Sequence, residues 1–138
     1  MKSFGAFFAA LPLVASVLIG CGETNSNADM HQDVVGESGI LHFEIDADAP
    51  LSQGTNDLRI SIHEAGTDAP VTGASVGLFA VMPAMAHDSP DAAKVEEIGA
   101  GTYLARDVAL PMPGRWEVHV QASRADELDK ATFAYDIR

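Results

Sequence analysis

The sequence predicts an all-β fold for residues 40–138, and three observations carry that prediction. Apolar and polar residues alternate with a period of two in short segments, and Gly, Pro and Asp interrupt these segments at short intervals. No segment has convincing helical periodicity. About seven short strands within about one hundred residues are typical of an immunoglobulin-like β-sandwich of antiparallel strands, without the paired cysteines of antibody domains.

The strands follow from their apolar faces. In the first, over 41–46, Leu41 and Phe43 lie on one face while His42 and Glu44 lie on the other. Further strands are expected at 58–63, 76–82, 95–98, 103–110, 116–121 and 133–137. Segment 76–82 is more continuously apolar, as in a strand buried on both faces. Trp116 alternates inward in its strand, so it is expected in the core.

The first twenty residues are predicted to be a lipoprotein signal peptide. Lys2 precedes an uncharged run from Phe4 to Ile19, which is too short for a spanning helix and fits the apolar region of a secretory signal. The run ends in Leu18-Ile19-Gly20-Cys21, which resembles the bacterial lipobox. The resemblance implies cleavage after Gly20 and lipidation of Cys21. The alternative is an ordinary signal peptide with a chance cysteine.

Residues 21–39 are expected to comprise the lipidated cysteine and a flexible tether, because they are rich in Asn, Ser, Asp, Glu and Gly. Met30-His31 could form an accessory ligand pair, but an unstructured tether residue is the favoured interpretation. Attachment through Cys21 would place the protein in the cell envelope, facing the periplasm or the extracellular space. It would also use the one cysteine, leaving histidine and methionine as soft metal ligands.

The charge balance excludes one class of partner. The segment after Gly20 holds 20 acidic and 7 basic residues, a formal charge of −13 with neutral histidine. Such a surface repels phosphate backbones, so nucleic acid is not an expected partner. It also disfavours binding of the domain itself to anionic lipid, so we expect membrane attachment to come from the anchor.

The segment from Met82 to His87, Met82-Pro83-Ala84-Met85-Ala86-His87, brings two thioethers and an imidazole together. These ligand types favour copper, and thioethers favour Cu(I) in particular. The segment follows the third expected strand, and Met112 precedes the sixth. Because these strands are antiparallel neighbours in such sandwiches, Met112 is expected near Met82 and Met85, at the end opposite the tether. Alternatively, Met82 is core, Met112 fills a proline turn and His87 is solvated.

Five short segments, taken in order and spacing, resemble those of YtkA-like domains. They are Gly54-Thr55-Asn56-Asp57-Leu58, Gly73-Ala74-Ser75-Val76, Met82 to His87, Gly99-Ala100-Gly101-Thr102-Tyr103 and Met112-Pro113-Gly114-Arg115-Trp116. These domains are small extracytoplasmic β-sandwiches related to the FixH and CopC-like proteins of copper handling. The resemblance implies a copper-linked role, and Met82, Met85, His87 and Met112 are the residues that carry over. CopC-like Cu(II) sites use a histidine at the mature amino terminus, where this chain would have a lipidated cysteine.

Other motifs carry less chemistry. Gly73-Ala74-Ser75-Val76-Gly77 matches the G-x-S-x-G nucleophile elbow but opens an expected strand, so a chance match is favoured and no enzyme is predicted. His42, Glu44, Asp46 and Asp48 could bind calcium, although a solvated strand face is the favoured interpretation. His63 and His119 fall on polar faces and are expected at the surface.

Two functions follow as hypotheses. The first is a membrane-anchored extracytoplasmic module that binds Cu(I) at Met82, Met85, His87 and Met112 and exchanges it with a partner protein in copper trafficking or homeostasis. The second is a metal-free structural or protein-interaction module built on the same sandwich.

Overall fold

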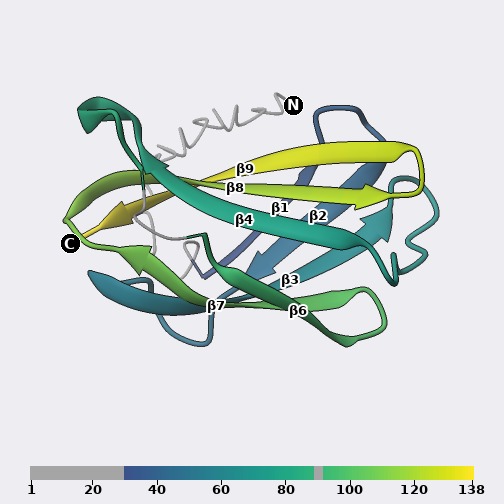
Figure 1. Cartoon of the computed structure of the whole chain (residues 1–138), viewed down its shortest axis with the longest axis horizontal. Coiled ribbons are helices and arrows are strands. Elements are labelled where there is room, and N and C mark those ends of the chain that lie inside the picture. Colours follow the sequence, from purple (N-terminus) through teal and green to yellow (C-terminus); the bar gives the residue numbers. More distant parts are fainter. Residues whose placement is uncertain (1–29, 89–91) are drawn as a thin grey trace, which may run out of the picture.

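The computed structural model describes residues 30–88 and 92–138 as two antiparallel sheets packed face to face (Figure 1). The first sheet has the order β1 (His31–Val35), β2 (Leu41–Asp46), β3 (Gly54–Glu64), β7 (Thr102–Leu110) and β6 (Lys94–Gly99). The second has the order β5 (His87–Asp88), β4 (Ser75–Met82), β8 (Gly114–Arg124) and β9 (Glu127–Ile137). A 3-10 helix, η1 (Pro83–Met85), joins β4 to β5. The predicted all-β sandwich is confirmed.

Alternating residues of the two sheets fill the space between them. Phe43 and Ile60 of the first sheet are fully buried, as are Trp116 and Val118 of the second, so the expected core position of Trp116 is confirmed. Removal of these side chains from water is the main stabilising contribution to such a fold. Among residues 30–88 and 92–138 we find no helix with the length and apolar character needed to cross a membrane. The signal peptide and Cys21 lie outside the described residues.

Strand β1 lies within the segment that the sequence predicts to be a flexible tether, so that prediction is wrong for residues 31–35. β1 pairs with β2 in antiparallel register, from His31 opposite Asp46 to Val35 opposite His42. On its other side, the Gln32 side-chain amide donates a hydrogen bond to the Ala134 carbonyl oxygen at 3.0 Å. Hydrogen bonds on both sides hold this mostly polar strand in place, and Val34 packs against the core.

The path of β1 also corrects the expected position of the tether. Gln32 contacts Ala134, which pairs with Glu117, which in turn pairs with Val81 next to the end of β4. Because β1 runs antiparallel to β2, the described chain begins at the end of the sandwich that carries η1 (Figure 1). The methionine segment therefore lies at the same end as the beginning of β1, and not at the opposite end.

Strand β4 is buried on one face only, which corrects the prediction of burial on both. Its inward residues, such as Leu78 and Ala80, are buried, whereas Phe79 is 48% exposed on the outer face. The Phe79 ring stacks on His119 of β8, with centroids 4.9 Å apart and an interplanar angle of 10°. The apolar run of β4 thus includes a solvent-facing aromatic side chain.

Candidate metal sites

The predicted methionine ligands lie at different depths. Met82 ends β4 and is 4% exposed, whereas Met85, in η1, is 64% exposed. Met112 is half-buried in the connection that precedes β8 and packs against the core. His87 begins β5, where its backbone pairs with Met82, but its side chain lies outside the described part of the chain.

The two connections that carry these residues meet at one corner of the sandwich. β4 and β8 are antiparallel neighbours, as the sequence predicts. A Cβ atom placed on Gly114 would lie 3.1 Å from the Met82 Cε atom, so Met82 packs directly against the start of β8. The Trp116 indole N–H donates to the Met112 carbonyl oxygen at 2.9 Å and fixes the connection. The structure therefore brings Met82 and the Met112 connection together, with Met85 projecting into solvent.

A second cluster lies on the outer face of the first sheet. The potential ligand atoms of His42, Glu44 and His63 all lie within 4.8 Å of one another. His42 and His63 are directly opposite each other on β2 and β3, and Glu44 lies two residues further along the same face. Two imidazoles and one carboxylate form a ligand set suited to Cu(II) or Zn²⁺.

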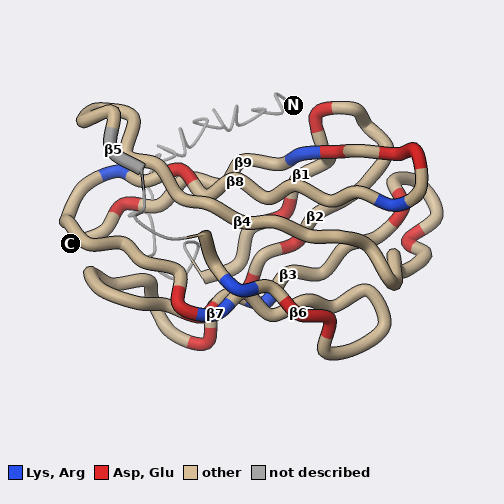
Figure 2. Tube along the Cα trace, in the orientation of Figure 1, with Lys and Arg blue, Asp and Glu red and all other residues tan. Residues whose placement is uncertain are grey.

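Two carboxylates near this cluster, one on β1 and one on β2, lie within hydrogen-bond distance of histidines. Asp33 Oδ2 lies 3.2 Å from His42 Nε2. One row further along, His31 Nδ1 lies 2.7 Å from Asp46 Oδ1. The hydrogen bond to Asp46, together with the negative charge of that carboxylate, raises the pKa of His31 above its ordinary value of 6.5. Acidic residues occur along both sheets (Figure 2), so the wider field favours cations.

This grouping differs from the four residues that the sequence allows, but does not favour, as a calcium site. Asp46 pairs with His31, and Asp48 Oδ1 lies 3.4 Å from an Arg59 side-chain nitrogen, so these two carboxylates have other partners. His42 and Glu44 are instead grouped with His63, which was expected to be only a surface residue. The signal that could have found it is the register of the β2–β3 pair, which places His63 opposite His42.

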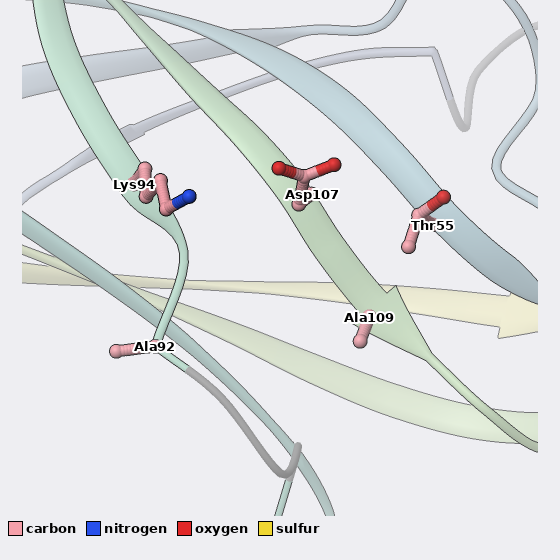
Figure 3. A pocket seen from close by; sticks show the side chains of 5 residues that line it. All are labelled: Thr55, Ala92, Lys94, Asp107 and Ala109. Atoms are coloured by element: carbon pink, nitrogen blue, oxygen red, sulfur yellow. The ribbon is translucent and has the colours of Figure 1, made fainter.

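A pocket lies at the end of the first sheet opposite the imidazole–carboxylate cluster, and its lining provides few potential ligands. It is lined by Thr55, Ala92, Lys94, Asp107 and Ala109 (Figure 3). One amine, one carboxylate, one hydroxyl and two methyl groups do not resemble either candidate metal set. Ser75 begins strand β4, so the G-x-S-x-G match lacks the strand–turn–helix context of a nucleophile elbow.

The structure thus defines a small β-sandwich with an imidazole–carboxylate cluster on one face and a methionine corner at one end. The YtkA-like family model matches residues 37–121, and the chain belongs to the YtkA-like family. No curated protein matches it in sequence. Strand β1 lies before the matched region.

Solved structures share the fold at low sequence identity. FetP of uropathogenic Escherichia coli, as isolated, is 7% identical with a TM-score of 0.54, over 76% of this chain and 91% of that one. A copper-bound variant of FetP, with one glutamate replaced by glutamine, is 6% identical with a TM-score of 0.53, over 78% and 89%. A DUF4785 family protein of Legionella pneumophila is 14% identical with a TM-score of 0.50, over 73% and 29%. These similarities establish the architecture.

Proposed function

We propose that this protein is a membrane-anchored extracytoplasmic module that binds copper. The observation that carries the proposal is the convergence of His42, Glu44 and His63, whose ligand atoms lie within 4.8 Å of one another. Membership of the YtkA-like family and the shared fold with a copper-bound FetP variant support copper as the metal. Lipidation of Cys21 would hold the module at the membrane.

The two candidate sites suit different oxidation states. The imidazoles and carboxylate of the first sheet suit Cu(II), whereas the thioethers of Met82, Met85 and Met112, with His87, suit Cu(I). The exposure of Met85 supports a role in metal exchange, because a partner can reach its sulfur directly. In this proposal copper passes to or from a partner protein by ligand exchange, without covalent chemistry.

The test is a competition titration of the full chain, purified in detergent, with Cu(II) and separately with Cu(I). We expect stoichiometric Cu(II) binding that is lost in His42→Ala/His63→Ala. The matched control is His119→Ala, which removes a histidine from the outer face of the other sheet. Equal weak binding by all three proteins would contradict the Cu(II) site.

The Cu(I) site is tested separately by the triple variant Met82→Leu/Met85→Leu/Met112→Leu. Leucine keeps the apolar volume but removes the sulfur ligands. We expect Cu(I) binding to disappear while the folded state persists. Unchanged Cu(I) binding would contradict methionine ligation. Absence of binding in both titrations would favour the metal-free interaction module, for which exposed Phe79 offers a contact surface.

The anchor has its own test. An alkyne-tagged fatty acid supplied to growing cells should label the wild-type protein, and Cys21→Ser should remove the label. The nine residue-to-residue steps from Cys21 to Met30 span at most about 32 Å when fully extended. Because β1 begins at the end that carries η1, the proposed anchor would hold the methionine corner towards the membrane.

A further inference from the structure

We propose that Asp33 of β1 is a positioning residue of the metal site, where it orients the imidazole of His42 so that Nδ1 faces the metal. The inference rests on the proposed metal-binding function of His42, Glu44 and His63. It adds to that site a residue from outside the region matched by the family model.

The geometry at His42 carries the inference. Asp33 Oδ2 lies 3.2 Å from His42 Nε2, within reach of a hydrogen bond. A carboxylate only accepts hydrogen bonds, so Nε2 must carry the proton. The lone pair of the neutral ring then lies on Nδ1, so in this proposal Nδ1 is the nitrogen available to the metal. Hydrogen bonds of this kind fix the ring orientation of metal-binding histidines and raise their basicity.

The pairing of β1 explains why Asp33 reaches this position. Asp33 lies opposite Glu44, and Val35 lies opposite His42, so the Asp33 side chain reaches its histidine diagonally across the sheet. The strand is held on its other side by Gln32 and by the Glu37 N–H, which donates to the Lys130 carbonyl oxygen at 2.8 Å. Asp33 is therefore presented by a strand that is fixed on both sides.

The chain offers a matched control in the next row of the same face. Asp46 pairs with His31 as Asp33 pairs with His42, but neither Asp46 nor His31 belongs to the cluster. Removal of either carboxylate changes the charge of the face by the same amount. Only the removal of Asp33 takes a hydrogen-bond partner from a candidate ligand. The two variants therefore distinguish an effect of the His42 ring orientation from an effect of the surface charge.

The first measurement is Cu(II) affinity of the full chain and its variants by competition. We expect Asp33→Ala to weaken binding about 10-fold, since loss of such a partner typically costs 10–100-fold. Asp33→Asn keeps an acceptor oxygen, so its Cu(II) affinity should lie between that of Asp33→Ala and that of the wild type. Asp46→Ala should change the affinity less than about 2-fold, because it is outside the cluster. Thermal unfolding checks that each variant is folded.

The second measurement is made without metal. Long-range ¹H–¹⁵N NMR of the imidazoles should show the Nε2–H tautomer for His42 in the wild type and a mixture of tautomers in Asp33→Ala. If the wild type and Asp33→Ala bind copper with equal affinity, the role of Asp33 is overturned and the proposed function is not. No copper binding by the wild type would overturn the proposed function. An Nδ1–H tautomer for His42 would overturn the orientation regardless of copper.

Discussion

The Asp129 Oδ2 atom on β9 accepts a hydrogen bond from the Leu41 backbone N–H on β2 at 3.0 Å. The same carboxylate accepts three more backbone hydrogen bonds, from the N–H groups of Ser38, Ile40 and Lys130. Gly36 leaves room for it, because a Cβ there would collide with the carboxylate. One buried side chain therefore joins the β1–β2 turn to the second sheet.

This arrangement predicts a loss of stability in acid. Burial raises the pKa of the Asp129 carboxyl, but its four backbone hydrogen bonds lower it by more, so the pKa lies below the ordinary 3.8. A lowered pKa stabilises the fold above the unfolded-state value, and the contribution is lost as the pH falls through the folded-state value. Asp129→Ala should cost roughly 3 kcal/mol near neutral pH, because it leaves buried donors unpaired.

The measurement is urea unfolding of the wild type and Asp129→Ala between pH 7 and pH 3. The difference in free energy of unfolding should shrink towards low pH. A difference that stays constant over this range would show that the charge of Asp129 contributes nothing.

Met82 should respond to substitution as a core residue. Met82→Ala should lower the free energy of unfolding by roughly 2 to 5 kcal/mol, since it opens a cavity beside Gly114. Met82→Leu should cost less than about 1.5 kcal/mol, because it conserves volume. Met85→Ala serves as the exposed comparison and should be nearly neutral. Urea unfolding measures all three, and a neutral Met82→Ala would refute the core position.

Tyr103 should stabilise the connection between β3 and β4. Its hydroxyl donates to the Val71 carbonyl oxygen at 2.8 Å and accepts from the Ala74 N–H at 3.0 Å. Tyr103→Phe keeps the ring but leaves both backbone groups without this partner, so we expect a loss of about 1 to 3 kcal/mol. Chemical unfolding measures it, and amide exchange at Ala74 should accelerate. Unchanged exchange at Ala74 would contradict the role of the hydroxyl.

His31 should titrate above its ordinary value. The hydrogen bond and the negative charge of Asp46 favour the protonated ring and raise the pKa of His31 above 6.5. Its contribution to stability is therefore present below the unfolded-state pKa and is lost as the pH rises through the folded-state value. NMR titration should give a midpoint above 6.5, and Asp46→Asn should lower it. Equal midpoints in the two proteins would exclude Asp46 as the cause.

The sequence predicts the parts of this fold that depend on apolar alternation. The seven expected strands and the core position of Trp116 follow from that pattern. The pairing of β4 with β8 follows from the sandwich class that the pattern indicates. The pattern does not predict strand β1, because this strand is mostly polar and is held by backbone pairing with β2 and by a side-chain hydrogen bond to Ala134 on β9. Apolar alternation does not predict the metal cluster either. The proximity of His42 to His63 depends on the register of two strands, which alternation does not specify.

Strand β1 also has a consequence for aggregation. It forms the polar edge of the first sheet and covers the backbone of β2, whose inner face is fully apolar. Exposed edge strands are templates for pairing between molecules, and charged residues on an edge suppress that pairing. A chain shortened to the family-matched region would begin at residue 37 and present β2 as a new edge. We therefore expect strand β1 to protect the folded domain from edge-to-edge pairing with its own copies.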